Sequence, residues 1–257
     1  MAIIIKSKEE QAKIRETGRI VAAILAELRN VVRPGITTAE IDKLGMEALK
    51  RHGAKSSALG YHGYPASLCT SVNEEVVHGI PGNRVLKEGD IVSIDFAASY
   101  KGWHADSAIT VPVGKVAAEV QRLLQVTEEA LYRGIAVARA GKRLQDIGRT
   151  VQQFVEAAGY SVVRQYGGHG VGRSMHEDPQ VLNYIERGYP NYVLKPGMVI
   201  AIEPMVIMGK KETKVLADEW TVISADGTYA AHFEHTVAIT DGEAEILTLA
   251  EEEISQK

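Results

Sequence analysis

Apolar residues recur every three or four positions through the first fifty residues, and this spacing predicts two amphipathic helices. Each helix begins at a capping box, in which a hydroxyl and a carboxylate three residues later bond each other's backbone amides. Ser7 with Glu10 forms the first box, and Thr37 with Glu40 forms the second. The first helix should stop before a Pro-Gly pair at residues 34–35, and the second at Gly53.

The pattern changes between residues 66 and 113, where β-branched residues, turn glycines and short alternating runs predict strands. Two further helices are predicted over residues 115–140 and 143–158, and Gly141 and Gly159 mark their ends. Residues 160 to about 249 are again typical of strands. Two helices followed by strands therefore occur twice, with no linker-like or low-complexity stretch between the halves.

An internal repeat underlies this order. Residues 86–95 match residues 194–203: each segment has a Lys-x-Gly turn, a strand of buried type and a carboxylate nine positions after a leucine. Weaker echoes pair residues 33–35 with 139–141, and the His-x-x-Pro segment at 78–81 with the one at 176–179. We therefore expect a single catalytic domain over residues 1–257, with two similar halves at roughly 1–113 and 114–249 that share one core. A site should lie where the halves meet.

Composition narrows the function classes without identifying one. Apolar residues make up 45% and charged residues 24% of the 257 positions, which is ordinary for a globular protein and excludes wholesale disorder. A net charge of −4 gives the chain no general attraction for nucleic acid, so we expect no specific DNA binding. The single cysteine, Cys69, excludes an intramolecular disulfide and a cysteine-based metal cluster. No apolar run exceeds seven residues, so we expect no membrane span and a cytoplasmic protein.

Four acidic residues occupy strand positions that should be buried. Asp95 lies in the apolar strand predicted at 91–96, and Asp106 lies in the strand at 103–113 that returns from it. A four-residue loop between the strands would place the two aspartates opposite each other, whereas a two-residue loop would make them diagonal neighbours on one face. Glu203 and Glu234 repeat the anomaly in strands predicted at 198–207 and 229–240. Because an unpaired buried charge is costly, something positive should lie among the four carboxylates.

One imidazole completes this set. His169 lies in a glycine-rich turn predicted after a strand at 161–166, and the glycines would let backbone and metal approach closely. Several carboxylates with one imidazole suit Mn, Fe, Co, Zn or Mg, and bridging carboxylates suit two ions about 3.5–4 Å apart. His104 and Asp106 imitate part of an iron site, but His104 would lie towards the turn, so we do not expect it to be a ligand.

These residues, in this order and with these neighbours, closely resemble the metal ligands of type I methionine aminopeptidases. The resemblance extends over essentially the whole chain and includes the motifs at residues 61–65 (Tyr-His-Gly-Tyr-Pro), 78–81, 168–170 and 202–204. It implies an α+β fold of the pita-bread (creatinase/aminopeptidase) type, in which two pseudo-symmetric halves surround a curved, mostly antiparallel sheet with helices on the outside. The internal repeat agrees with this implication.

The resemblance also implies a role for each site residue. Two divalent metal ions, of Co, Mn, Fe or Zn, would be held by Asp95, Asp106, His169, Glu203 and Glu234. Asp106 and Glu234 would bridge the two ions, and Glu203 would also transfer protons to and from the attacking water. His78 and His176 would be catalytic without binding metal, one towards the substrate amine and scissile amide and the other towards the carbonyl.

A pocket for the methionine side chain is implied as well, and its lining would be Tyr61, Tyr64, Cys69, His78, Met175, His176 and Trp220. Two positions depart from what is common in the family, because Met175 replaces a phenylalanine and Ala58 replaces a cysteine. Neither belongs to the ligand set, and both would alter the shape of the pocket. Ordinary surface or internally satisfied positions are expected for the remaining histidines named here: His62, His104, His232 and His235.

The implied function is hydrolysis of the initiator methionine from nascent peptides whose second residue is small. The 31 positions from Glu203 to Glu234 leave no room for the helical insertion of type II enzymes. The alternatives are a proline-directed pita-bread peptidase and a catalytically inactive pita-bread module that binds or scaffolds other molecules. The expected partner is the N-terminus of a nascent chain, and the enzyme should be a monomer. A transient ribosome contact would use Lys210, Lys211 and Lys214, or Lys8, Lys13, Arg15 and Arg19 of the first helix.

Overall fold

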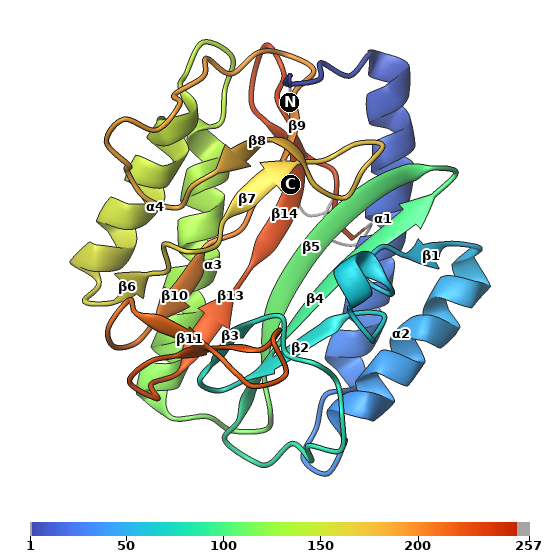
Figure 1. Cartoon of the computed structure of the whole chain (residues 1–257), viewed down its shortest axis with the longest axis vertical. Helices are drawn as coiled ribbons and strands as arrows, with labels where there is room; N and C mark the ends of the chain where they lie inside the picture. The colour runs from blue at the N-terminus through green and yellow to red at the C-terminus, as the bar shows by residue number, and fades with distance from the viewer. Residues whose placement is uncertain (1, 251–257) are drawn as a thin grey trace.

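A computed structural model describes residues 2–250 of the protein (Figure 1). Over these residues the helices are α1 (Lys8–Val31), α2 (Thr38–His52), α3 (Ala118–Val137) and α4 (Leu144–Ala157), with a short 3₁₀ helix η1 (Tyr61–Gly63). The strands of the first half are β1 (Lys55–Ser56), β2 (Cys69–Val72), β3 (Glu75–Val77), β4 (Ile91–Tyr100) and β5 (Trp103–Pro112). Those of the second half are β6 (Ser161–Val162), β7 (Gly168–Gly170), β8 (Glu177–Val181), β9 (Val199–Ile202), β10 (Met205–Ile207), β11 (Thr213–Val215), β12 (Val222–Ser224), β13 (Ala230–His232), β14 (Glu234–Ala238) and β15 (Glu245–Ile246).

The predicted helix starts are confirmed in their hydrogen bonds. Ser7 and Thr37 cap α1 and α2, and in both cases the glutamate three residues later accepts the bond from the cap's own amide. Gly53 ends α2 in the left-handed conformation, with φ of 64°. The later helices α3 and α4 are a few residues shorter at their ends than the sequence pattern indicates.

One antiparallel sheet forms the centre of the molecule. Its strands follow the order β1-β4-β5-β14-β9-β7-β8, with β2 also paired to β4 and β15 to β14. Two smaller sheets, β13-β10-β6 and β11-β12-β3, flank it. Figure 1 shows the strands crossing the middle of the molecule, with α1 and α2 at one side and α3 and α4 at the other. The expected antiparallel sheet with outer helices is therefore confirmed.

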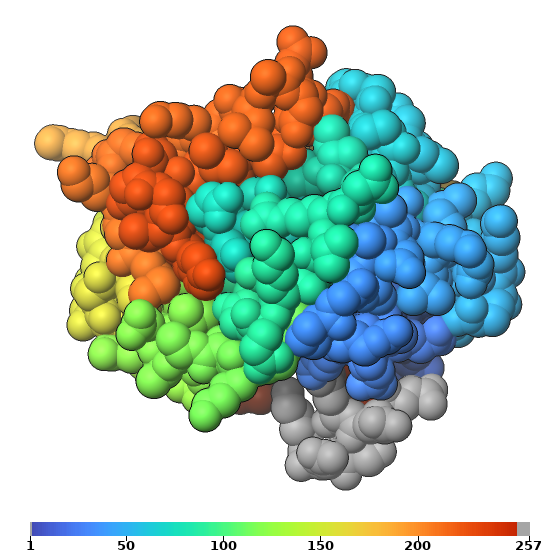
Figure 2. Space-filling model, turned by 90° about the horizontal axis from the view of Figure 1, so that it is seen from below, coloured from blue at the N-terminus to red at the C-terminus, as the bar shows by residue number. Residues whose placement is uncertain are grey.

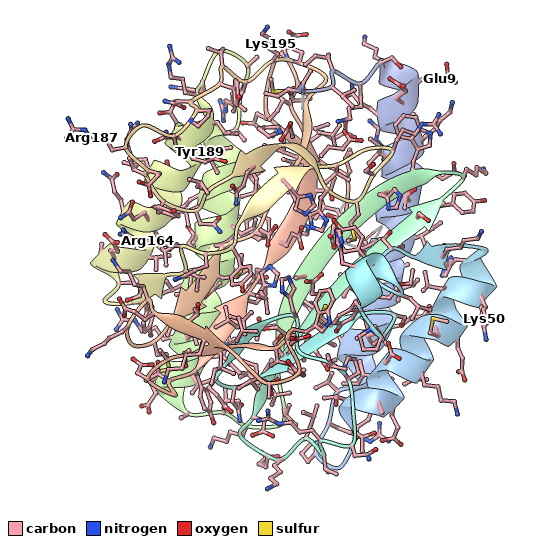
Figure 3. The ribbon with its side chains drawn as sticks, viewed as in Figure 1. Glu9, Lys50, Arg164, Arg187, Tyr189 and Lys195 are labelled. Carbon is pink, nitrogen blue, oxygen red and sulfur yellow. The ribbon has the colours of Figure 1, made fainter. Side chains whose placement is uncertain are left out.

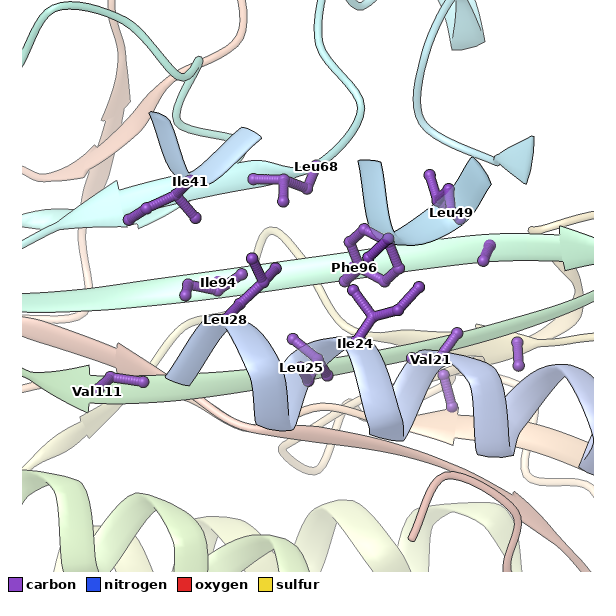
Figure 4. Close-up of a cluster of buried hydrophobic side chains, with 14 of the residues drawn as sticks. Val21, Ile24, Leu25, Leu28, Ile41, Leu49, Leu68, Ile94, Phe96 and Val111 are labelled. Atoms are coloured by element: carbon purple, nitrogen blue, oxygen red, sulfur yellow. The ribbon is translucent and has the colours of Figure 1, made fainter. Parts of the chain in front are cut away.

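Each pair of helices buries its apolar face on its own part of the sheet. One cluster is formed by residues of α1, α2, β4 and β5. It includes Ile24, Leu28 and Phe96, which are fully buried (Figure 4). A second cluster joins α3 and α4 to β9 and β14. At roughly 25 cal/mol for each Å² of apolar surface removed from water, these clusters are the main source of stability. No helix within residues 2–250 is both long and apolar enough to cross a membrane.

The two halves use matching backbone contacts where the sequence repeats. A bridge joins Thr37 to Val85 in the first half, and an equivalent bridge joins Arg143 to Val193 in the second. The turn glycines before these helices donate to matching leucine carbonyls, Gly35 to Leu86 at 2.8 Å and Gly141 to Leu194 at 3.0 Å. Figure 2 shows the molecule from below, where a teal segment of the first half lies against the blue helical region.

Two long strands predicted in the second half are each broken in the structure. The segment predicted at 198–207 divides into β9 and β10, and the one predicted at 229–240 divides into β13 and β14. Pro204 has no amide hydrogen to donate to a ladder, so the chain leaves the main sheet there, and the Phe233 amide lies opposite its carbonyl at 3.4 Å. Glu203 and Glu234 therefore lie at strand ends, where the large sheet joins a small one, and not in strand interiors. The strand predicted at 161–166 is also shorter, since only two of its residues form β6.

Candidate active site

Five neighbouring strands of the main sheet each bring one predicted ligand to the same place. In the order of the sheet, β4 carries Asp95, β5 carries Asp106, β14 begins with Glu234, β9 is followed by Glu203, and β7 carries His169. These strands come from both halves of the chain, so the site lies where the halves meet.

The hairpin of β4 and β5 has a two-residue loop, which is one of the two loop lengths that the sequence allowed. Lys101 and Gly102 form this turn with φ of 52° and 77°, and Tyr100 pairs with Trp103. Asp95 consequently lies opposite Ala108 and not opposite Asp106. The two aspartates are diagonal neighbours on one face, which separates their charges more than direct opposition would.

His169 lies in the middle of a short strand and not in a turn. The flanking glycines are needed because the neighbouring strands approach closely: a Cβ on Gly168 would lie 2.1 Å from the Ala201 carbonyl oxygen. The His169 Nδ1 lies 2.9 Å from the Gly170 carbonyl oxygen, so this nitrogen carries the hydrogen. Its Nε2 is left as an acceptor, 3.9 Å from Asp106 Oδ2 and 3.7 Å from a Glu203 oxygen. This orientation is the usual one for a metal-binding imidazole.

The carboxylates crowd one another in a buried space. Burial raises the pKa of Asp106 and of Glu234 well above the usual range, and the neighbouring acidic groups raise both further. Burial also raises the pKa of Asp95, against the opposing effect of nearby His232. Burial acts in the same direction on Glu203, but the surrounding histidines outweigh it and lower its pKa.

Two buried oxygens of this cluster, Asp106 Oδ1 and Glu234 Oε1, have no hydrogen-bond partner among residues 2–250. One ligand atom each from Asp106, His169 and Glu234 lie within 4.8 Å of one another. Buried carboxylate oxygens and an imidazole acceptor that face one another need a positively charged partner to compensate for the loss of water. The donor set therefore fits divalent metal.

A cavity of about 160 Å³ adjoins this cluster. Its wall contains all seven residues predicted for the substrate pocket, together with Ala58, Ala97, Asp95 and Asp106. Tyr64 and Trp220 meet edge to face on one side, with ring centroids 5.0 Å apart. Aromatic edges and two sulfur atoms, those of Cys69 and Met175, make a surface suited to a flexible apolar side chain.

The two non-ligand histidines also border this cavity. His176 Nδ1 lies 2.9 Å from the Tyr61 hydroxyl, and the His176 ring lies 4.1 Å from that of His169. Although His176 keeps an exposed edge, desolvation of its ring lowers the pKa to about 4, and His169 contributes to the decrease. His78 has φ of 59° and meets Trp220 with ring centroids 6.4 Å apart.

Two polar residues near Glu203 were not predicted from the sequence. His232, expected to be an ordinary histidine, is buried with its Nε2 3.6 Å from Glu203 Oε2. Asn183, fully buried, donates its side-chain amide to the Glu203 carbonyl at 2.9 Å. The sequence does contain a signal that His232 lies near the cluster, because His232 is only two positions before Glu234. By contrast, His104 is bonded to Ser57 at 2.8 Å and stays out of the cluster, as expected.

A buried carboxylate–imidazole cluster beside a cavity of this size suits a metal-dependent enzyme, and the model of metallopeptidase family M24 matches residues 12–241. Methionine aminopeptidase 1 of Bacillus subtilis is 52% identical over 96% of this chain and 99% of its own length. The methionine aminopeptidase of Escherichia coli is 46% identical over 98% of this chain and 96% of its own length. The chain therefore belongs to metallopeptidase family M24 and, within it, to the methionine aminopeptidases.

Solved structures agree with this assignment. The crystal structure of the Thermotoga maritima methionine aminopeptidase has a TM-score of 0.94 and 45% identity, and the match covers 96% of this chain and all of that one. The prolidase of Pyrococcus furiosus shares the fold with a TM-score of 0.79 at 25% identity, but this chain covers only 66% of it. The pita-bread fold expected from the resemblance is thus confirmed.

Proposed function

We propose that the protein is a metal-dependent aminopeptidase that removes an N-terminal methionine from peptides whose second residue is small. The observation that carries this proposal is the convergence of five adjacent strands on one buried cluster of ligands beside a cavity with aromatic and sulfur-containing walls. Full-length relatives named methionine aminopeptidase support the substrate. A proline-directed peptidase is less well supported, because the prolidase of Pyrococcus furiosus is only 25% identical and this chain covers only 66% of it. An inactive module is less well supported, because five candidate ligand residues converge on one buried cluster.

The residues that would hold divalent metal are Asp95, Asp106, His169, Glu203 and Glu234. Bound divalent ions supply a water that is acidic near neutral pH and positive charge for a developing oxyanion. The unpartnered oxygens of Asp106 and Glu234 support this assignment. This donor set of carboxylates and one imidazole accepts Co, Mn, Fe and Zn.

The remaining catalytic work falls to residues that border the cavity. We propose that Glu203 moves the proton between the attacking water and the departing amine. The Tyr61 hydroxyl can donate to His176 Nδ1, which leaves the Nε2–H of His176 to donate to the substrate carbonyl. His78 faces the same cavity and would bind the substrate amine and the scissile amide.

The cavity itself would select the methionine side chain. Its sulfur-containing and aromatic walls make soft contacts with an unbranched thioether, to which a rigid or charged side chain is poorly matched. Met175 and Ala58 both line this cavity, so they would tune its shape in this chain.

We further propose that the chain acts as one catalytic domain of two repeats, as a monomer in the cytoplasm, on the N-termini of nascent proteins. Basic side chains such as Arg187 and Lys195 project at the periphery in Figure 3. Lys210, Lys211 and Lys214 are also exposed, and within residues 2–250 they form no salt bridge, so they are available for a transient contact with the ribosome.

Peptide hydrolysis tests the substrate rule. Free methionine should be released from Met-Ala-Ser and not from Met-Lys-Ser by the same metal-loaded preparation, because the second side chain must fit beside the ligands. Equal release from both peptides would contradict the second-residue rule. Release of proline-adjacent residues with no release of methionine would favour the proline-directed alternative.

A further inference from the structure

One lysine–glutamate pair lies in the interior of the protein and joins residues 171 positions apart. Lys6 Nζ is 2.7 Å from Glu177 Oε2, and the two side chains are only 2% and 8% exposed. In every other lysine or arginine salt bridge within residues 2–250 the cation is at least 30% exposed. Surface pairs of that kind contribute little, whereas a buried pair strongly constrains the groups that it joins.

The Glu177 carboxylate organises the loop that precedes it. Its Oε1 accepts hydrogen bonds from the backbone amides of Arg173 at 2.8 Å and Ser174 at 3.3 Å. Gly172 provides the space for this carboxylate, because a Cβ at that position would lie 2.4 Å from Oε1. Residues 172–176 are therefore wrapped around one buried charge.

The Lys6 ammonium reaches this loop from a fixed backbone. The Lys6 amide donates to the Gly197 carbonyl at 2.8 Å, and Gln11 donates to the Lys6 carbonyl at 2.9 Å. The loop is also held from the other half of the molecule. The Gly172 carbonyl accepts from the His104 amide at 2.9 Å, and the Arg173 guanidinium lies over the Trp103 ring at 4.0 Å.

The loop presents two residues to the cavity, Met175 and His176. His176 also contacts Tyr61 and His169, so a small displacement of the loop would move its imidazole relative to the ligands. We propose that Lys6 and Glu177 are positioning residues for His176, and that their ion pair holds the imidazole in its working place. This inference rests on the proposed function only in taking His176 to act on the substrate.

The physical consequence of breaking the pair follows from burial. Without the ammonium, the Glu177 carboxylate is left buried and uncompensated, and it gains water only by moving outwards. That movement removes the acceptor from the Arg173 and Ser174 amides. Replacing both charged groups at once relieves this conflict, because a glutamine at 177 keeps an oxygen for the loop amides without carrying charge.

The test compares Lys6→Met, Lys6→Arg and the double variant Lys6→Met/Glu177→Gln with wild type. The control is Arg139→Met, which removes the cation of an exposed pair with Glu243. Hydrogen–deuterium exchange of the metal-free proteins reports the order of residues 172–176 without relying on activity. Steady-state kinetics with Met-Ala-Ser and saturating Mn then report kcat and KM separately.

We expect Lys6→Met to speed amide exchange in residues 172–176 by about tenfold or more, with α1 unaffected. It should lower kcat by about tenfold while KM changes by less than about threefold. Lys6→Arg and Arg139→Met should remain near wild type, and the double variant should recover most of the loss. If Lys6→Met does not fold, Glu177→Gln alone leaves the lysine uncompensated and should change exchange and kcat in the same direction.

The proposal is overturned if exchange in residues 172–176 is the same in Lys6→Met and wild type. It is also overturned if the double variant is as impaired as Lys6→Met. A wild-type protein that releases no methionine with any metal would instead contradict the proposed function, and the exchange data would still decide whether the pair orders the loop.

Discussion

Because the carboxylates are crowded, replacing one of them should stabilise the metal-free protein and weaken its stabilisation by metal. Oxygens of Asp106 and Glu234 lie within 4.8 Å, where two unit charges repel by about 3.5 kcal/mol at an effective dielectric constant of about 20. Partial protonation, which the raised pKa of both groups implies, reduces this repulsion in the metal-free protein. Glu234→Gln removes one of the two charges and puts a neutral amide near the Asp106 carboxylate. It should therefore raise the free energy of unfolding without metal by about 1–3 kcal/mol.

The assay is urea unfolding near neutral pH, with chelator and then with Mn at a hundred times its dissociation constant from the wild type. Mn should stabilise the wild type by about 2.7 kcal/mol, and it should stabilise Glu234→Gln by much less, because that variant lacks a carboxylate that would hold the metal. Glu47→Gln is the matched control, since Glu47 is exposed on α2 and its substitution should change neither value. If Glu234→Gln were less stable than wild type in chelator, the carboxylates would not be in conflict and this reasoning would be refuted.

Three further substitutions test separate parts of the structure. Tyr61→Phe removes the hydroxyl beside His176 and should lower kcat for Met-Ala-Ser by about 3–10-fold, the equivalent of one hydrogen bond; an unchanged kcat would show that the bond does not orient the ring. Gly168→Ala places a methyl group 2.1 Å from a carbonyl oxygen of the adjacent strand, so it should weaken Mn binding in calorimetry by at least about tenfold, whereas Gly82→Ala, with no atom nearer than 4.0 Å, should not. Leu28→Ala leaves a cavity in the first core cluster and should cost about 2–5 kcal/mol in urea unfolding, with kcat of the folded protein retained.

Local signals in the sequence were sufficient to predict the helices and to single out the candidate ligands that the fold brings together. The capping boxes at Ser7 and Thr37 depend on residues only three positions apart, so they need no tertiary information. Asp95 and Asp106 stand out because charge is costly in an apolar strand, and the structure brings them to one face. The repeat could be read because matching turns recur with matching spacing.

Other features depend on contacts that periodicity does not encode. The sequence did not distinguish a two-residue from a four-residue loop between β4 and β5, because both loop lengths keep Asp95 and Asp106 on one face of the sheet. The strand breaks at Glu203 and Phe233 occur where the main sheet meets a small sheet. The apolar pattern of the sequence is the same before and after each break, so it does not indicate where one strand ends and the next begins. The partnership of Lys6 with Glu177 spans 171 positions, so no local pattern could indicate it.

The most direct test of the central claim is the release of free methionine from Met-Ala-Ser by the chelator-treated protein as Mn is added. The account predicts no release in chelator and release that rises with added Mn until the five-strand site is filled. Undiminished release in chelator would contradict the metal-dependent mechanism. No release from the folded protein with Mn, Co, Fe or Zn would contradict the assignment as an active aminopeptidase.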